Sequence, residues 1–496
     1  MSPTSESIAE NVREELETLL GKVMNGGQER VTADQVERHL WRSLLVLGRM
    51  LMQLFFTVRS EREVQRPAIE VEGGRYAHMG QPSRQYVSLF GEVEVKRHYY
   101  WSRGVGGRYP LDAELSLPER LYSDCVQEML GAIEVWVPQD NTLGLIEQFF
   151  GLSIPKGSLQ GSTADQAAYV EAYYDQRAAP PTPDEDTILV VTVDGKGIPM
   201  TRRDSPPPQA RRSKGQKKTA KKEAVVTATY TVAPYARTSE DIIQALLAAS
   251  GETEGSSQTP VRPPIHGKQT FGTLNGKTRA LDQLSSVVAQ RQQTSIVHRL
   301  ALTDGALALQ QQTEAAFPGF TLILDLIHAV EYLWDAVNTL LGETHPDRIA
   351  WMTDALHCVL DEELDHLLGH LDYQRTSPAL SPAQQKTLTT VVNYLRRNQP
   401  YMHYQQYLAQ GWPIGTGVIE GACRHLVKDR FEQSGMRWSL AGAEVMLRLR
   451  SVSLNGDWAD FQSFRRQQAH VTRYASPYPE PIPGCSPEPF FLEMAA

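Results

Sequence analysis

Two stretches of the sequence decide the fold, ILVVTVDG (188–195) and IVHRLALTDG (296–305). Each is a short run of apolar and β-branched residues that ends in Asp-Gly, which is typical of a buried β-strand followed by a turn. GKGIPMTRR (195–203) predicts a hairpin partner of the first strand, and EAVVTATYTV (223–232) and FTLILDL (320–326) predict two further strands. Five strands are therefore predicted.

Helical segments between these strands set the fold class. EDIIQALLAA (240–249) and ALALQQQTEAAF (306–317) are predicted helices, so the order of elements is β-β-β-α-β-α-β. This order predicts an α/β domain of the ribonuclease H-like class, in which a mixed sheet carries helices on both faces and acidic residues at strand ends. From about residue 328 to 410 the pattern is almost wholly helical, which indicates a helical insertion in this domain.

The residues before the sheet predict a separate region. The pattern from Glu6 to about Arg62 is helical, and RQYVSLFGEVEVKRHYYW (84–101) alternates as a β-hairpin does around Gly91. Residues 142–174 have the helix, turn and helix spacing of a DNA-binding helix-turn-helix, for which plain helix packing is the alternative. The predicted organisation is a helical region (1–80), the β-hairpin with the helix-turn-helix (81–177), a Pro-rich linker (178–187), the first part of the α/β domain (188–330), its helical insertion (331–410), its closing helices (411–475) and a Pro-rich tail (476–496).

Composition excludes several classes of protein. The chain has 496 residues, of which 41% are hydrophobic and 22% charged, as in a globular protein of several domains. Because no uninterrupted apolar run has the length of a membrane span and the first residues lack a signal-peptide pattern, we expect a cytoplasmic protein with no membrane partner. The four cysteines (Cys125, Cys358, Cys423 and Cys485) lie far apart, which argues against a disulfide framework and a cysteine-ligated zinc site.

Asp194 and Asp304 are the first candidate site residues. A carboxylate at the carboxyl end of a central strand lies at the rim of the sheet, where ligands bind in α/β proteins. One Asp-Gly pair is more often an ordinary turn, but two strands that end in the same way favour a shared metal site. Carboxylates are the ligands that Mg²⁺ (or Mn²⁺) prefers, and two such ions activate the attacking oxygen and stabilise the leaving oxygen in phosphodiester transfer.

A third ligand is predicted in WPIGTGVIEGACRHLVKDRFEQSGMRW (412–438). Glu420 follows a glycine-containing turn and shares a helix face with Arg424, while Lys428 and Arg430 come in the next turns. One acid among basic residues suits a metal ligand that lies beside a DNA backbone. The alternative is an ordinary surface ion pair between Glu420 and Arg424.

Asp325 and His328 form a second pair, in ILDLIHAVEYLW (323–334), between a strand and a helix. His328 is a candidate to contact a phosphate, to orient Asp325 or to bind metal transiently. Asp325 competes with Asp304 as the second metal ligand, and the alternative for it is a helix N-cap.

A basic segment beside Asp194 predicts a DNA contact. It contains nine Lys and Arg residues and one acid, Asp204, and neutralising phosphates with these charges would make DNA binding salt-dependent. The alternative is a solvated charge run. The predicted DNA-binding residues are Arg202, Arg203, Arg211, Arg212, Lys214, Lys217, Lys218, Lys221 and Lys222 in this segment, with Arg424, Lys428 and Arg430 near Glu420.

Four segments, VTVDGKGIPM, LTDGALAL, FPGFTLILDLIHAVEYLW and GVIEGACRHLVKDRFEQSGMRWSLAGAEVMLRLRS, resemble those of bacterial insertion-sequence transposases of the ISKra type, over roughly residues 80–460. The resemblance implies a DDE transposase that acts on double-stranded DNA, at the element ends and at the target. Its catalytic acids fall on Asp194, Asp304 and Glu420, and an accessory Asp-x-x-His motif falls on Asp325 and His328. It also implies a dimer or higher oligomer on DNA, and a cytoplasmic, nucleoid-associated location.

The chain departs from that family at RHYYWSRGVGGRYPLD (97–112), which lacks the cysteine pair of a small zinc ribbon. A zinc-stabilised N-terminal module is therefore in doubt, whereas a β-hairpin can persist by packing alone. Two other functions fit the same residues: a metal-dependent DNA nuclease or resolvase, and a DNA-binding protein that descends from a transposase and has lost its chemistry.

Overall fold

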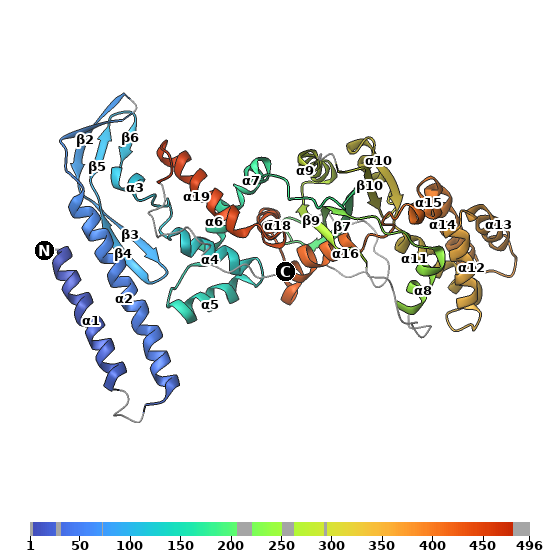
Figure 1. The fold of residues 1–496 in the computed structure, drawn as a ribbon, viewed down its shortest axis with the longest axis horizontal. Helices are drawn as coiled ribbons and strands as arrows, with labels where there is room; N and C mark the ends of the chain where they lie inside the picture. Colours follow the sequence, from blue (N-terminus) through green and yellow to red (C-terminus); the bar gives the residue numbers. More distant parts are fainter. Residues whose placement is uncertain are drawn as a thin grey trace. The chain divides into compact units, whose positions relative to one another are not determined.

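The computed structural model describes residues 3–25, 31–71, 73–205, 221–249, 262–291 and 295–479, and the chain divides into two compact units (Figure 1). Residues 1–173 and 456–496 form the first unit, and residues 174–455 form the second. The predicted linker at 178–187 is not the boundary. It belongs to the second unit, where Asp186 is buried and its Oδ2 accepts a hydrogen bond from the hydroxyl of Thr231 and pairs with Nδ1 of His266.

The first unit begins with a hairpin of two long helices, α1 (Ser5–Asn25) and α2 (Ala33–Arg62). Thr32 and Gln35 form a capping box at the start of α2. The hydroxyl and amide of Ser5 donate to the carboxylate of Glu61, so the start of α1 lies beside the end of α2 and the helices run antiparallel. Among the described residues, α2 alone is long and apolar enough to cross a membrane by length and composition, and 6% of its most apolar stretch is buried.

Strands follow α2, in two groups. β1 (Ala68–Val71), β2 (Gly74–Gly80), β5 (Tyr99–Ser102) and β6 (Gly106–Arg108) form one antiparallel sheet. β3 (Ser83–Ser88) and β4 (Gly91–Lys96) form the predicted hairpin, in which Gly91 has a φ of +123°, a conformation that favours glycine. The prediction of helix up to residue 80 is wrong, because Ile69, Val71 and Tyr76 alternate with polar residues across a Gly-Gly turn.

Helices complete the first unit. They are α3 (Pro110–Glu114), α4 (Asp124–Glu134), α5 (Gln139–Phe150), α6 (Lys156–Ala167), the start of α7 (Val170–Gln176) and α19 (Trp458–Tyr474). The predicted helix, turn and helix pattern corresponds to α5 and α6, which pack around Leu130, Ile146 and Leu159. The assignment of all closing helices to the α/β domain is wrong for α19, because Arg465 and Arg466 of α19 pair with acids of α4 in the first unit.

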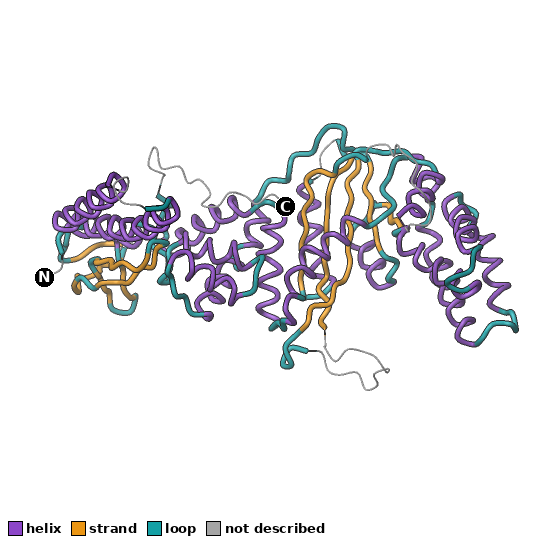
Figure 2. Tube along the Cα trace, turned by 90° about the horizontal axis from the view of Figure 1, so that it is seen from below, coloured by secondary structure: helices purple, strands orange, loops and turns teal. Residues whose placement is uncertain are grey.

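The second unit is built on a five-stranded mixed sheet with the order β11-β10-β7-β8-β9 (Figure 2). The strands are β7 (Ile188–Pro199), β8 (Lys221–Val232), β9 (Ile265–Thr273), β10 (His298–Thr303) and β11 (Thr321–Leu324). β7, β8 and β9 are antiparallel neighbours, whereas β10 runs parallel to both β7 and β11.

Two strand predictions were wrong. Gly195–Pro199 continues β7 instead of turning back, and β8 pairs with β7 along its whole length, from Ile188 to Pro199. Gly195 is therefore not a turn residue. A side chain there would meet the carboxylate of Glu223 on β8, which lies close to Gly195. The third strand is β9, whose sequence IHGKQTFGT lacks the alternation that predicts a strand. The helix at 239–249 precedes β9, so the order of elements is β-β-α-β-α-β-α-β and the predicted order β-β-β-α-β-α-β is wrong.

Helices cover both faces of this sheet. Leu189, Val191 and Val193 of β7 pack on one face against α9 (Lys277–Gln290) and α10 (Leu307–Ala316). Ile188 and Val190 pack on the other face, against α8 (Ser239–Ala249) and the predicted helical insertion. The insertion consists of α11 (Leu326–Leu341), α12 (Arg348–Leu360), α13 (Leu364–Arg375), α14 (Pro382–Asn398), a short 3₁₀ turn (Gln399–Tyr401) and α15 (Tyr404–Ala409).

The segment around Glu420 is a helix of mixed type. α16 (Gly417–Ala422) continues as a π-helix (Cys423–Lys428) and then as α17 (Asp429–Phe431), and after a 3₁₀ turn (Gln433–Gly435) α18 (Leu440–Leu454) follows. The wide π turn is stabilised by Arg450 of α18, which donates to the carbonyl oxygens of His425 and Leu426. Burial lowers the pKa of the Arg450 guanidinium to about 9. π-helical turns are frequent at functional sites, and this one follows Glu420 by three residues.

Candidate active site

Asp194 lies in β7, and Asp304 directly follows the adjacent parallel strand β10. The register of the parallel pair β7 and β10 places Leu302 beside Thr192, and the same offset of 110 residues separates Asp304 from Asp194. Side chains alternate between the faces of a strand, and Val190 and Leu302 lie on the face that α11 covers. Asp194 comes four residues after Val190 and Asp304 two residues after Leu302, so this alternation directs both aspartates to the same face. Neighbouring strands are about 4.8 Å apart, so the two carboxylates belong to one small region of the sheet edge.

The Asp194 carboxylate is half-buried and has two hydrogen-bond partners. Oδ1 accepts from the amide of Gly195 at 2.5 Å, and Oδ2 accepts from the thiol of Cys423 at 3.2 Å. Burial raises the pKa of the Cys423 thiol well above its ordinary value, and the charges of Asp194 and Glu420 raise it further. The thiol is therefore protonated at neutral pH and acts as the donor.

Glu420 lies on α16, which packs against β7 and β8. Its side chain is exposed, and it lies three residues before Cys423, whose thiol contacts Asp194. α16 thus brings Glu420 to the part of the sheet that carries Asp194, across more than 200 residues of sequence. The alternative prediction was an ion pair between Glu420 and Arg424. In the structure, Nε of Arg424 instead lies 3.8 Å from Oδ1 of Asp429.

Asp304 directly follows β10, in a tight turn. Oδ1 accepts from the amide of Ala306 at 2.9 Å, and the main-chain oxygen accepts from the hydroxyl of Tyr394 at 2.8 Å. Gly305 has a φ of +81°, and a side chain there would meet Leu324 and Tyr394. The turn therefore requires glycine, and it leaves the second carboxylate oxygen of Asp304 at a half-buried position.

Asp325 is fully buried and uses both oxygens. Oδ1 accepts from the amides of Ile327 and Thr416, and Oδ2 accepts from the hydroxyl of Thr416 and from Nδ1 of His328, both at 2.6 Å. Asp325 is the N-cap of α11, as its alternative assignment predicted. With these four bonds Asp325 is less available to a metal than Asp304. It instead ties the start of α11 to the residue that precedes α16.

His328 has its pKa raised to about 9 because Asp325 accepts its hydrogen bond and, more weakly, because the charges of Asp325, Glu331 and Asp304 favour the imidazolium. Desolvation opposes this shift. Of the three predicted roles, the geometry shows the orientation of Asp325. The imidazolium is about one third exposed, so it also places a positive charge near the sheet edge.

The predicted DNA-binding residues fall into three groups. Arg202 and Arg203 are exposed after the end of β7, whereas Arg211, Arg212, Lys214, Lys217 and Lys218 lie outside the described residues. Lys221 pairs with Glu432, and Lys222 is half-buried on β8. Arg424 and Lys428 are exposed on the π-helix.

The structure corrects the prediction for Arg430. It was predicted to contact DNA, but it is completely buried, with its guanidinium 4.8 Å from the Trp438 ring and Nη1 donating to the sulfur of Met436 at 3.2 Å. The prediction placed Arg430 within three turns of one helix with Glu420, whereas a π-helix (Cys423–Lys428) lies between these two residues. The π turn between Glu420 and Arg430 changes which residues point inward.

The site predicted from the sequence omits two residues that lie near Asp194, Cys423 and Lys196. The hydrogen bond from Lys221 lowers the pKa of Glu432, and Lys428 and Lys196 lower it further, so three lysines surround this one acid. A signal for Lys196 was its place two residues after Asp194. No signal in the sequence pointed to the contact of Cys423 with Asp194.

The donor set suits a hard divalent cation, because Asp194, Asp304 and Glu420 offer carboxylate oxygens. As the side chains stand, no three His, Cys, Asp or Glu residues in the described part of the chain are grouped so as to hold a metal ion. The Asp194 oxygen is capped by a thiol, which is a weak donor, and Glu420 faces solvent. The backbone thus brings the acids to one region, while their side chains are not gathered into a metal site.

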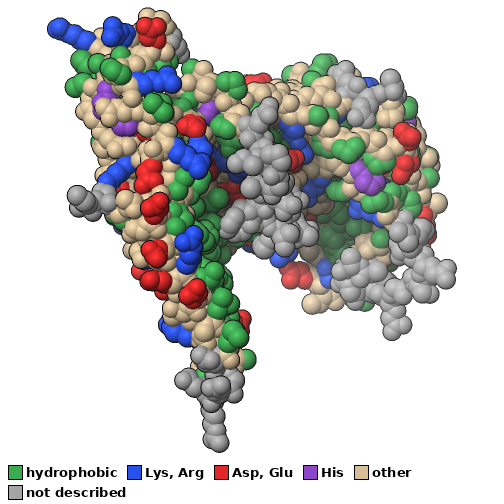
Figure 3. Space-filling view, turned by 60° about the vertical axis from the view of Figure 1, so that its left-hand side comes forward, with side chains coloured by type: hydrophobic (Ala, Val, Ile, Leu, Met, Phe, Trp, Pro, Cys, Tyr) green, Lys and Arg blue, Asp and Glu red, His purple; other side chains and the backbone are tan. Residues whose placement is uncertain are grey.

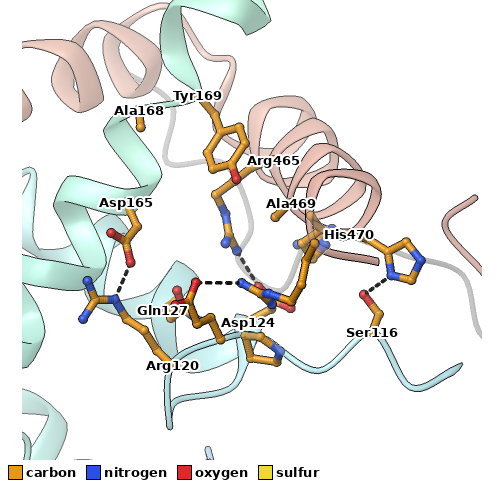
Figure 4. A pocket seen from close by; sticks show the side chains of 14 residues that line it. Ser116, Arg120, Asp124, Gln127, Asp165, Ala168, Tyr169, Arg465, Ala469 and His470 are labelled. Carbon is orange, nitrogen blue, oxygen red and sulfur yellow. Dashed lines mark hydrogen bonds and ion pairs between the residues drawn. The ribbon is translucent and has the colours of Figure 1, made fainter. Parts of the chain in front are cut away.

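A separate cavity of about 530 Å³ lies in the first unit, between α4, α6 and α19 (Figure 4). Arg120, Arg465, Arg466 and Arg473 line it, but each pairs with an acid: Asp165, Asp124, Glu128 and Glu119, respectively. These arginines hold the helices together. They do not form the unpaired basic surface that a phosphate backbone needs.

No protein-family model matches the chain, and no curated protein matches it. Among solved structures, it is similar to the Drosophila P element transposase strand transfer complex, with a TM-score of 0.30 and 9% sequence identity, over 67% of this chain and 92% of that chain. At this TM-score the likeness assigns neither fold nor function, so both are argued from the chain itself.

Proposed function

We propose that this protein is a DDE-type transposase of the ISKra kind, which cuts and joins DNA strands with Asp194, Asp304 and Glu420. The observation that carries the proposal is the place of Asp194 in β7 and of Asp304 directly after β10, its parallel neighbour, with the helix that carries Glu420 packed against β7. An ordinary Asp-Gly turn describes Asp304 but does not explain Asp194, because Asp194 lies within a continuous strand. Its carboxylate follows six buried residues of β7 and begins the partly exposed stretch of that strand, 194–197, so it is accessible to a ligand.

A ribonuclease H-like fold of the second unit is part of this proposal. It is supported by three antiparallel strands followed by two parallel ones, with the order β11-β10-β7-β8-β9 and helices on both faces. α9 connects β9 to β10, and α10 connects β10 to β11. In such a sheet the carboxyl ends of β7 and β10 are the expected place for a ligand.

Asp194, Asp304 and Glu420 would hold Mg²⁺ (or Mn²⁺). When bound, such ions activate the attacking oxygen and stabilise the leaving oxygen of a phosphodiester. The chain's own part is to position the acids. Asp325 holds Thr416 by two hydrogen bonds, and this fixes the start of α16 relative to α11.

Double-stranded DNA is the proposed partner. Lys196, Lys221 and Lys428 surround Glu432 near Asp194 and would contact phosphates. Arg202, Arg203 and Arg424 are exposed near the same segments, and binding through these charges would fall steeply with salt. α5 and α6 of the first unit remain candidates for a helix-turn-helix contact.

The experiment is a cleavage and strand-transfer assay with the full chain. The donor is a DNA fragment that carries the coding sequence with its natural flanks, the target is a supercoiled plasmid, and Mg²⁺ or Mn²⁺ is added. We expect cleaved ends and joined products from the wild type, and a loss of at least about 1,000-fold from Asp194→Asn and from Glu420→Gln with DNA binding retained. Full activity in either variant would refute the assignment.

The matched control for these variants is Glu331→Gln, which removes a carboxylate of α11 that is not proposed as a ligand. It should keep strand transfer within about twofold. A further pair of variants tests whether Asp304 or Asp325 is the second metal ligand. Asp325→Asn should weaken activity by disturbing α16, and Asp304→Asn should weaken it more.

A non-catalytic DNA-binding protein is the second candidate, and the ungrouped side chains of the three acids favour it. It predicts DNA binding with no metal-dependent cleavage in the wild type. Cleavage without joined products would instead identify a nuclease or resolvase. The same assay therefore separates the three functions.

A further inference from the structure

The α1–α2 hairpin carries an exposed apolar stripe on α2. Leu44, Leu51 and Phe55 are 51%, 46% and 46% exposed, although they are large hydrophobic residues. With Trp41 and Val58 they occupy five of six positions of a heptad pattern (41, 44, 48, 51, 55 and 58). The sixth is Gly48, where a side chain would meet the ring of Phe90. This spacing is the one by which helices pack side by side in coiled coils and helical bundles.

A second stripe lies on α1. Ile8 and Leu19 are the buried apolar residues of α1, so they face the interior of the hairpin. Leu16, Leu20 and Val23 recur at intervals of four and three residues on a neighbouring face and are about half exposed. Figure 3 shows hydrophobic side chains gathered along one side of the arm that α1 and α2 form.

These stripes are unexplained by the packing of the first unit. α2 meets the rest of that unit through other residues: Gln53 bonds to the main chain of Glu94, and the buried Phe56 packs on Tyr86. The part of the stripe from Trp41 to Gly48 is attached to the unit, since the Trp41 indole donates to the carbonyl oxygen of Phe149 and Gly48 lies against the ring of Phe90. Leu51 and Phe55 lie beyond this attachment and are exposed. A contiguous apolar surface of this kind on a globular protein usually marks an interface.

We propose that this surface is the dimer interface, and that its occupant is the α1–α2 hairpin of a second copy of this chain. A two-fold dimer would bury both stripes in a four-helix bundle. The charges of the helices complement each other in such a pairing. α1 carries five glutamates against one arginine and one lysine, whereas α2 carries five arginines against three acids.

In a two-fold arrangement the acidic α1 of one copy faces the basic α2 of the other, which fixes both partner and direction. The same charges argue against an anionic lipid surface, which would repel the glutamates of α1. The interface is inferred from the surface alone and does not rest on the proposed transposase activity.

The test is sedimentation equilibrium of the full chain at concentrations from about 0.5 to 50 μM, without DNA. The wild type should be a dimer, and the double variant Leu44→Glu/Leu51→Glu should raise the dimer dissociation constant at least about 100-fold, because two charges would enter the apolar interface of each copy. Both positions are exposed, so the helical circular dichroism of the variant should equal that of the wild type. If it does not, Leu44→Gln/Leu51→Gln takes its place.

Val46→Glu is the matched control. Val46 is an apolar residue of the same helix, 40% exposed, and lies about 140–160° around the helix from Leu44 and Leu51. This variant should stay dimeric. A monomeric wild type, or a dimer that persists in the double variant, would overturn the proposal, and so would a monomer that sediments with phosphatidylserine-containing vesicles.

Discussion

The thiol of Cys423 donates a hydrogen bond to Oδ2 of Asp194 at 3.2 Å, across 229 residues of sequence. This contact joins the π-helix behind Glu420 to the central strand of the sheet. Burial raises the pKa of the thiol, so the contact persists at neutral pH as a neutral donor and a carboxylate. The oxygen that a cation would use is thus occupied by a weak donor.

Replacing this thiol should make Asp194 more available to a cation. We expect Cys423→Ala to tighten Mn²⁺ binding about 2- to 10-fold, since the lost hydrogen bond is worth about 0.5–1.5 kcal/mol. Isothermal titration of the full chain with MnCl₂ measures this. Cys358→Ala, on α12, is the control and should bind Mn²⁺ as the wild type does. Equal or weaker binding by Cys423→Ala would contradict the inferred role of the thiol as a cap.

His328 should make stability depend on pH above neutrality. Its pKa is raised to about 9, mainly by the hydrogen bond to Asp325, so its contribution is complete below about pH 6.5 and is lost as the pH rises through about 9. The wild type should therefore lose on the order of 1–2 kcal/mol relative to His328→Gln between pH 6 and 10, a value reduced for solvent screening of this partly exposed group.

Urea unfolding of both proteins across this pH range provides the measurement. His345→Gln, which changes an exposed histidine, should follow the wild type. A constant difference between wild type and His328→Gln from pH 6 to 10 would show that the imidazolium does not contribute.

The Thr416 hydroxyl should matter for activity more than for DNA binding. Thr416→Val keeps the side-chain volume but removes the hydroxyl that donates to Oδ2 of Asp325. The buried carboxylate then lacks one hydrogen bond, which should lower the free energy of unfolding by about 1–3 kcal/mol. Because Thr416 precedes α16, Glu420 should be less well positioned and kcat for strand cleavage should fall at least about 10-fold with an unchanged Kd for DNA. Thr389→Val is the control, since that hydroxyl bonds only to the main chain of its own helix at Gln385. Equal kcat values for the two variants would remove the positioning role.

Lys428 and Arg430 are two residues apart and should behave differently. Lys428→Gln should weaken DNA binding and reduce the slope of log K against log salt by about 0.9, as expected for one lost phosphate contact. Arg430→Met should leave this slope unchanged and lower the midpoint of thermal unfolding, because the guanidinium is buried against Trp438. Fluorescence anisotropy with a labelled DNA duplex at several salt concentrations measures the slopes. A reduced slope for Arg430→Met would show that the helix rearranges on DNA.

Local patterns predicted those elements whose own residues carry a strong signal. β8, β10 and β11 and the helices from α11 to α15 follow the predictions, because their apolar residues repeat with the period of a strand or a helix. Gly195 and Gly197 misled the prediction, since in isolation Asp-Gly favours a turn. In the folded chain twelve residues of β8 pair with β7, and this pairing outweighs the local preference.

By itself, the sequence determined which residue types are available: carboxylates after apolar strands, basic residues near them, and a helical pattern in the first 62 residues. Only the tertiary structure decided which of these meet. The pairing of β10 with β7 brings Asp304, which follows β10, to the region of Asp194. Arg430 is buried against Trp438, and the oxygens of Asp325 accept hydrogen bonds from Thr416 and His328. The physical reason is that such contacts join residues tens to hundreds of positions apart, so they depend on strand pairing and helix packing, which local periodicity does not encode.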